Sequence, residues 1–161
     1  MKRKTKFAVS FFLFILIILT LGFIFGNSLM SRSESAAVSD GTLKIFTDIL
    51  GKDNPMALFL TRYIRKLAHF TEFGILGTEV LLFFGSIGLK GAVKILSSVN
   101  FGLLIAVTDE TLQIFSERGS STLDVLIDYA GYLTFTAVLL LLKYIVAHIR
   151  KKRKEVSDAS L

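Results

Sequence analysis

Long apolar segments separated by short polar ones organise the whole chain. Uncharged or weakly charged runs lie at about 7–26, 67–88, 95–115 and 123–147. Each run is about as long as a helix that crosses the hydrocarbon core of a bilayer. We therefore predict an all-α integral membrane bundle of four transmembrane helices, in a single domain that covers residues 1–161.

The segment between the first two spans contains signals of its own. Residues 27–35 are rich in serine and are predicted to form a polar linker. Apolar residues at helical spacing within 43–50 then predict a short amphipathic helix, either on the membrane surface or packed against the bundle. Asn54 followed by Pro55, the one proline of the chain, marks the start of a helix that runs from about 55 to about 88.

Lysine and arginine are concentrated near both ends of the chain and predict its orientation. Basic residues precede the first span, follow the fourth span in a basic tail at 150–161, and occur in the loop between the second and third spans. By the positive-inside rule, both termini lie in the cytoplasm and the amphipathic helix is extracytoplasmic. Basic residues between the first two spans argue in the opposite direction. The first run resembles a signal peptide but is too long for one, so we expect an uncleaved anchor.

Composition excludes several classes of protein. Of 161 residues, 52% are hydrophobic and 20% are charged, which excludes a disordered chain and argues against a soluble domain. Cysteine is absent, which excludes disulfides, thiolate metal sites and a cysteine nucleophile. The net charge of +6 is explained by the basic cytoplasmic segments, so no nucleic-acid partner is expected.

Charged residues within the second, third and fourth spans lie towards the same side of the predicted bundle. On each span they recur at steps of three and four, which places them on one helix face. They predict an outward-facing polar pocket, with Glu79 deepest, formed by Lys66, His69, Glu72, Glu79, Asp109, Glu110, Gln113, Arg118, Asp124 and Asp128. Acids outnumber bases, so either some carboxyl groups are neutral or a cation joins them.

This surplus of acids has three interpretations at the level of sequence. A substrate or headgroup site is favoured because ionisable residues inside a membrane are functional by default. Structural ion pairs that fix helix register are the second, for example Lys66 or Arg118 with Asp109 or Asp124. A divalent-cation site is the third, with His69 and the carboxylates as ligands, although no specific metal-ligand motif is present.

Two sequence blocks also match a known pattern. The first is Lys66-x-x-His69-Phe70-x-Glu72-Phe73-x-x-Leu76-Gly77. The second is Asp109-Glu110-x-x-Gln113-x-Phe115-x-x-Arg118, followed by Asp124-x-x-x-Asp128-x-x-Gly131. Together these blocks resemble the VanZ-like family over about 62–135. The family pattern usually has asparagine where this chain has Asp128, which adds a negative charge.

The resemblance implies a small multi-pass protein of the bacterial cytoplasmic membrane, in a family whose namesake is associated with teicoplanin resistance. We expect the pocket to bind or modify a lipid or cell-wall headgroup and to lower susceptibility to glycopeptides such as teicoplanin. One alternative is a membrane enzyme in which His69 is the acid or base, Glu72 orients it and Asp109 or Asp124 assists, or in which His69 and the carboxylates are metal ligands. A second is a proton-coupled transporter or accessory subunit, motivated by Glu79. Expected partners are membrane lipids or a cell-wall precursor, and a homo-oligomer is compatible with the pattern.

Overall fold

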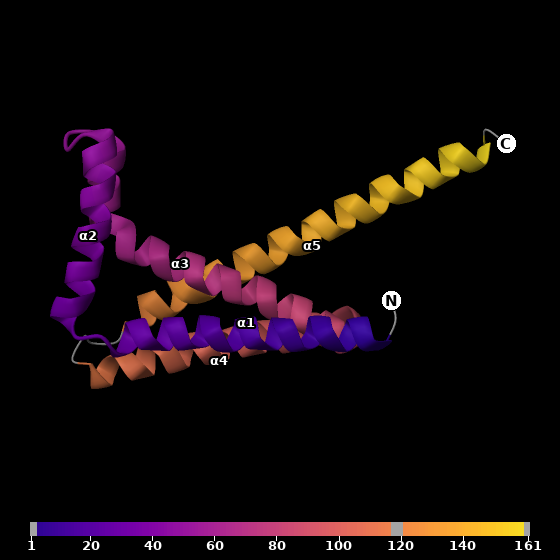
Figure 1. The fold of residues 1–161 in the computed structure, drawn as a ribbon, viewed down its shortest axis with the longest axis horizontal. Helices are drawn as coiled ribbons and strands as arrows, with labels where there is room; N and C mark the ends of the chain where they lie inside the picture. The colour runs from indigo at the N-terminus through magenta and orange to yellow at the C-terminus, as the bar shows by residue number, and fades with distance from the viewer. Residues whose placement is uncertain (1–2, 117–120, 160–161) are drawn as a thin grey trace.

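The computed structural model describes residues 3–116 and 121–159, and this part of the chain is helical with short connections. The helices are α1 (Arg3–Leu29), α2 (Arg32–Leu50), α3 (Pro55–Ser86), α4 (Gly91–Phe115) and α5 (Thr122–Ala159). Within the described part, α1, α3, α4 and α5 are long and apolar enough to cross a membrane, which confirms the predicted spans. The start of α1 and the end of α5 lie at the end of the bundle opposite α2 (Figure 1), as an even number of spans requires.

Local signals set both ends of α3. The Asn54 side chain accepts a hydrogen bond of 2.9 Å from the backbone N–H of the second helical residue, and proline occupies the first position as predicted. At the other end, Gly88 has a φ of 104°, and the Leu89 N–H donates to the Phe84 carbonyl at 2.9 Å. This Schellman arrangement stops α3 sharply and turns the chain into α4.

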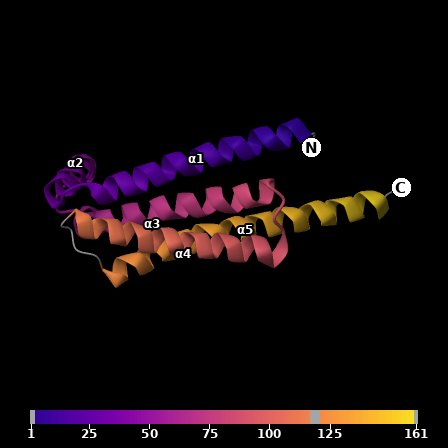
Figure 2. The same cartoon turned by 90° about the horizontal axis from the view of Figure 1, so that it is seen from below.

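The prediction of a polar linker at 27–35 is wrong. α1 continues to Leu29, and α2 already begins at Arg32. The Ser31 hydroxyl accepts from the Glu34 N–H at 3.3 Å, and the Glu34 carboxylate accepts from the Ser31 N–H at 2.8 Å, so a capping box starts the helix. α2 is therefore longer than the amphipathic helix predicted from its second half. It lies across the end of the bundle, has no buried residue and packs against α3 (Figures 1 and 2).

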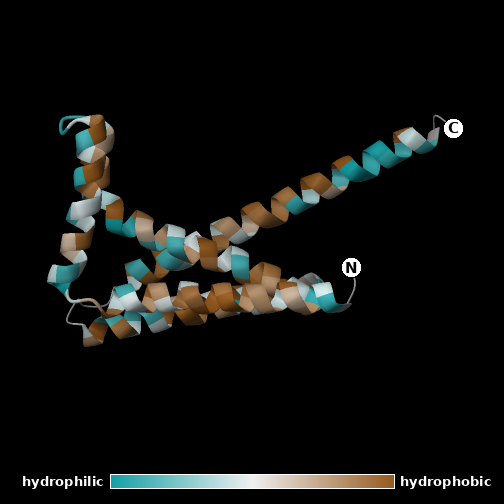
Figure 3. Cartoon of the chain, viewed as in Figure 1, coloured by the Kyte–Doolittle hydropathy of each residue, from teal (hydrophilic) through white to brown (hydrophobic). Residues whose placement is uncertain are grey.

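The last helix is also longer than the predicted span. α5 continues through the basic segment at 150–154 as far as Ala159 and extends beyond the other helices (Figure 1). In Figure 3, hydrophilic colours are concentrated on this extension, α2 and the first part of α3 show hydrophilic and hydrophobic colours together, and the middles of the spans are mostly hydrophobic. The predicted tight turn at 116–121 lies mostly outside the described residues, and Arg118 with it.

Small residues let α3 and α5 cross at close range. A Cβ added at Gly131 would lie 2.1 Å from the carbonyl oxygen of Phe70, and one at Gly77 would lie 2.7 Å from the carbonyl oxygen of Tyr132. Such distances mean that the two backbones are almost in contact. Phe73 and Tyr132 are fully buried beside this crossing. The crossing thus sets the first turns of α5 against the polar turns of α3.

Candidate functional site

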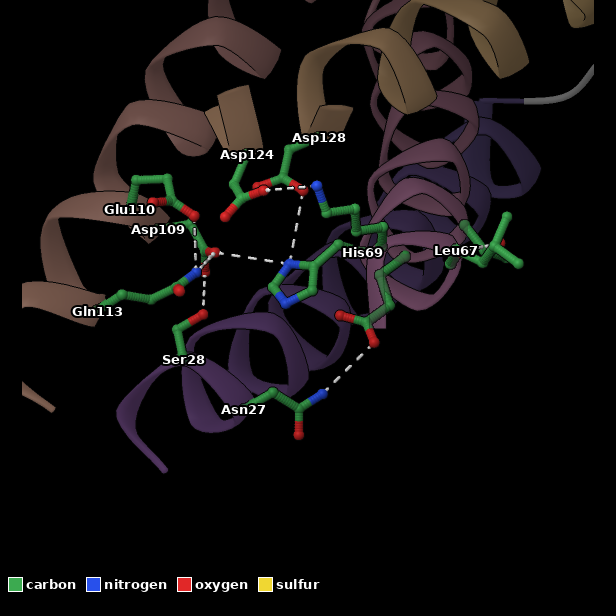
Figure 4. Close-up of polar contacts among 12 residues, drawn as sticks. Asn27, Ser28, Leu67, His69, Asp109, Glu110, Gln113, Asp124 and Asp128 are labelled. Carbon is green, nitrogen blue, oxygen red and sulfur yellow. Dashed lines mark hydrogen bonds and ion pairs between the residues drawn. The ribbon is translucent and has the colours of Figure 1, made fainter. Parts of the chain in front are cut away.

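An imidazole and two carboxylates meet where α3, α4 and α5 converge (Figure 4). The Nδ1 atom of His69 lies 3.8 Å from Oδ2 of Asp109 and 3.5 Å from Oδ1 of Asp128. The two carboxylates are 0% and 1% exposed, and the imidazole is 13% exposed. We call these three residues the His69 cluster.

Neutral donors hold Asp109 in its orientation. The Ser28 hydroxyl of α1 donates to Oδ1 at 2.6 Å, and the Gln113 amide donates to Oδ2 at 3.1 Å. The same amide nitrogen donates to Glu110 at 2.9 Å, and the other oxygen of Glu110 accepts the Ser121 backbone N–H at 2.8 Å. Because these bonds are buried and connected, they fix the side of the cluster formed by α4.

An ion pair lies at the rim of the site. The Lys66 ammonium is 3.9 Å from Asp124, and these side chains are 46% and 29% exposed. A pair this exposed contributes little to stability. Beside it lies a cavity of about 20 Å³, room for roughly one water molecule or ion. It is lined by Arg65, Lys66, His69, Glu110, Gln113, Asp124, Ile127 and Asp128.

A larger cavity of about 350 Å³ lies between α1, α2 and α3, on another side of His69. Its polar part contains Asn27, Arg65, His69 and Glu72. Oε1 of Glu72 accepts from the Asn27 amide at 3.5 Å, and its buried Oε2 accepts no hydrogen bond from any described residue. The remaining lining is apolar or small, from Phe23, Met30, Ser35, Val38, Ser39, Thr42, Ile64 and Ala68. We call this space the α1–α3 cavity.

A further hollow continues from the α1–α3 cavity along α1 and α3. It has a volume of about 260 Å³ and shares Phe23 and Glu72 with the first space. Leu19, Thr20 and Ile75 complete its lining, so it is almost entirely apolar. The two hollows therefore adjoin at Phe23 and Glu72, and the second one lies along two helices that are long enough to cross a membrane.

Comparison with known proteins gives a family. The family model described as VanZ/LLP1 matches residues 11–143, most of the chain. The chain belongs to the VanZ/LLP1 family. The match confirms the family resemblance and includes every residue of the His69 cluster and both of its cavities. Neither a curated protein nor a solved structure matches the chain.

In this VanZ/LLP1 protein, most of the predicted site residues lie close together. The structure brings together Lys66, His69, Glu72, Asp109, Glu110, Gln113, Asp124 and Asp128 around the cluster and its cavities. Glu79 is placed elsewhere: it lies two turns beyond Glu72 and accepts a hydrogen bond from Thr20 at 3.1 Å. Arg118 falls outside the described residues.

Sequence reasoning missed what α1 contributes to the site. Ser28 and Asn27 contact the predicted carboxylates directly, but they were assigned to a linker. Their position in the sequence indicates this role, because they follow the first apolar run at the same end of the bundle as the charged residues of the other three spans. A polar residue in the last turn of a span can still point into the bundle.

The arrangement has two chemical capacities. An imidazole between carboxylates can exchange a proton with a group placed beside it. The same three side chains each offer one ligand atom to a cation. Which of the two operates depends on what the adjoining cavities hold.

Proposed function

We propose that this VanZ/LLP1-family protein binds an anionic amphiphile of the bacterial cell envelope, a membrane phospholipid or a lipid-linked cell-wall precursor, at the outer side of the cytoplasmic membrane. The headgroup of this lipid lies against Arg65, His69 and Glu72, and its acyl chain lies in the hollow between α1 and α3. The observation that supports this most is the change of lining between two adjoining hollows that share Phe23 and Glu72, from charged groups beside His69 to apolar side chains along α1 and α3.

Charge selects the headgroup in this proposal. Arg65 lines both cavities of the site and is exposed, so its guanidinium is available to a phosphate group. The unpartnered oxygen of Glu72 requires a donor, since a buried carboxylate oxygen without one is costly. A headgroup with both a phosphate and a hydroxyl or amine satisfies the two side chains together.

Size and position support an acyl chain rather than a free headgroup. The α1–α3 cavity alone, at about 350 Å³, falls within the range of small-molecule sites. The adjoining hollow extends along two helices that cross the membrane, so an alkyl chain would leave the headgroup in the direction of the lipid core.

Lipid quenching tests this proposal directly. The chain has no tryptophan, so Val38→Trp places a single tryptophan in the lining of the α1–α3 cavity, where it can be excited selectively. Reconstituted protein is mixed with small fractions of brominated phosphatidylglycerol or brominated phosphatidylcholine. We expect stronger quenching by the anionic lipid, and loss of this preference in Val38→Trp/Arg65→Gln. Leu104→Trp, exposed on α4, is the matched control and should be quenched equally by both lipids. Equal quenching at Val38→Trp would refute the proposal.

Protection against glycopeptides is the physiological part of the proposal. We expect expression in a sensitive Gram-positive host to raise the teicoplanin concentration that inhibits growth, because an envelope lipid bound by the protein is less accessible to the drug. Glu72→Gln/Asp109→Asn should abolish this effect at equal membrane abundance. Glu155→Gln/Asp158→Asn removes two exposed carboxylates of α5 and should retain it. If the wild-type protein gives no protection, the resistance role is rejected, and the quenching experiment alone decides the lipid site.

Catalysis is the second candidate function, favoured by the position of His69 between two buried carboxylates, one of them fixed by Ser28 and Gln113. In this case His69 is the general acid or base for a bond in the headgroup. Incubation of purified protein with extracted envelope lipids, with and without a divalent cation, should yield a product by mass spectrometry that His69→Gln does not form. Absence of any product from every lipid fraction would reject this candidate.

A further inference from the structure

We infer that the His69 cluster binds a divalent cation of the Zn²⁺ or Mn²⁺ kind inside the helical bundle. This inference goes beyond the proposed lipid binding, and it depends on His69, Asp109 and Asp128 rather than on the α1–α3 cavity. The cation would join helices α3, α4 and α5 at one point and would present an open coordination position beside the site.

Spacing within the cluster fits a shared ion better than direct hydrogen bonds. The three candidate ligand atoms all lie within 4.8 Å of one another. The separations of 3.5 Å and 3.8 Å from His69 Nδ1 to the two carboxylates are longer than the usual hydrogen bond of about 2.7–3.2 Å. Two ligands bound tetrahedrally at about 2.1 Å from a metal ion lie ~3.4 Å apart. The gap between the three side chains thus has nearly the dimensions of a coordination site.

Asp128 provides an independent indication that a ligand is needed. Its side chain is 1% exposed, and both of its oxygens are buried without a hydrogen bond from any described residue. A buried carboxylate in a membrane span is costly unless a cation or several donors compensate it. An ion held between His69 and Asp128 supplies this compensation, and one oxygen of Asp128 already faces the imidazole.

The surroundings of the cluster resemble those of metal ligands in general. Ligating carboxylates are usually oriented by further hydrogen bonds, and Asp109 receives them from Ser28 and Gln113. The adjoining cavity of about 20 Å³ has room for one water molecule as an additional ligand. Magnesium and calcium prefer oxygen ligands alone, whereas one imidazole with two carboxylates suits Zn²⁺ or Mn²⁺.

Metal analysis of the whole protein tests the inference. The protein is purified in detergent with a tag that lacks histidine, and bound metal is first removed with EDTA. It is then incubated separately with ZnCl₂ or MnCl₂ and desalted, and the metal that remains bound per chain is measured by mass spectrometry. We expect about one equivalent of at least one of the two ions per chain, and at least a tenfold weaker affinity in His69→Gln and Asp128→Asn, as for lost metal ligands or their supports. His148→Gln removes the other histidine, which is exposed on α5, and should bind as wild type does. Glu79→Gln, a carboxylate outside the cluster, should do the same.

Two results would overturn the inference. The first is a wild-type protein that retains neither ion. The second is metal that remains bound in Asp128→Asn, which would mark it as adventitious. Pulsed electron paramagnetic resonance of Mn²⁺ in His148→Gln gives an answer even if the cluster variants do not insert. His69 is then the one remaining histidine, so ¹⁴N coupling typical of a bound imidazole must come from it. Mn²⁺ without such coupling also refutes the site, and none of these measurements requires added lipid.

Discussion

Gly131→Ala should separate the two helices on which the site depends. The added Cβ would lie 2.1 Å from the carbonyl oxygen of Phe70 and 2.8 Å from its carbonyl carbon, whereas ordinary contact begins at 3.4 Å. The shortfall at the oxygen is 3.4 − 2.1, or 1.3 Å. Because both atoms belong to the backbone of α3, no change of rotamer can relieve the clash. α3 and α5 must therefore move apart by roughly this amount.

The expected free-energy change follows from two opposing effects. Overpacking of a buried contact costs about 1–3 kcal/mol, and the backbone contact here favours the upper end. Replacing glycine by alanine inside a helix contributes about 0.5–1 kcal/mol in the other direction. We expect a net loss of ~2 kcal/mol in the free energy of unfolding. The same movement lengthens the 3.5 Å separation between His69 and Asp128, so binding at the His69 cluster should weaken as well.

Unfolding by SDS, followed by circular dichroism at 222 nm, measures this change without a fluorescent residue. Gly26→Ala is the matched control, because a Cβ at that position of α1 meets nothing within 4 Å. The control should be stabilised by about 0.5–1 kcal/mol. If Gly131→Ala unfolds at the same SDS fraction as wild type, or is stabilised as the control is, the close crossing of α3 and α5 is wrong.

Three further predictions concern single hydrogen bonds. Tyr132→Phe removes the buried 3.0 Å hydrogen bond to Ser98 and should lower the free energy of unfolding in SDS by ~1 kcal/mol. The same substitution should cost less in a Ser98→Ala background, and an equal cost in both backgrounds would contradict the bond. Asn54→Ala removes the cap of α3 and should cost ~1 kcal/mol, seen as faster hydrogen exchange confined to its first turn. Hydrogen bonds from the side chain and backbone of Ser31 lower the pKa of Glu34, so this stabilisation of α2 is complete above the unfolded-state pKa and is lost as pH falls through the folded-state pKa. A ¹³C titration by NMR should show the pKa of Glu34 rising in Ser31→Ala, and an unchanged value would reject the capping box.

Hydropathy predicted the spans because a bilayer leaves few alternatives. Backbone groups in the hydrocarbon core must bond within the segment, so an apolar run of sufficient length is a helix. The start of α3 was equally well determined, since Asn54 and Pro55 act locally and do not depend on tertiary contacts. Between the spans this constraint is absent, and local composition was a poor guide.

The start of α2 shows what was overlooked. Its serines suggested a linker, but Ser31 and Glu34 have the spacing of a capping box, which the structure forms in full. The spacing of Ser31 and Glu34 is thus a stronger guide to the start of this helix than the serine content around it. In α5, the basic run after His148 continues the helix, where the sequence predicts a tail, because lysine and arginine are good helix formers and do not end a helix.

Helical periodicity predicted which side chains share a face of α3, α4 or α5, but not where those faces meet. Residues three and four apart share a face, and in the structure Gln113 donates to Asp109 while His69 and Glu72 line the same cavity. Helices that cross at an angle, however, bring different neighbours to successive turns of one face. Glu79 therefore meets Thr20 of α1 instead of the cluster. Periodicity along one helix cannot supply the crossing angle, which depends on where small residues such as Gly131 allow contact.

Asp128 is either a ligand in a binding site or one half of a structural ion pair. The effect of Asp128→Asn on the free energy of unfolding has opposite signs in the two cases. If a charged His69 and Asp128 serve only to fix helix register, Asp128→Asn breaks a buried pair and should destabilise the metal-free protein by about 3–5 kcal/mol. If Asp128 is instead a ligand kept at a cost to stability, the neutral amide removes an uncompensated buried charge, and the protein in EDTA should gain about 1–3 kcal/mol. We expect the gain, together with the loss of any stabilisation by Zn²⁺ or Mn²⁺. SDS unfolding of both proteins in EDTA measures it, with Glu79→Gln as the control for removal of a carboxylate elsewhere on the bundle. A large loss of stability in EDTA would show that the cluster is an ion pair that holds α3 to α5.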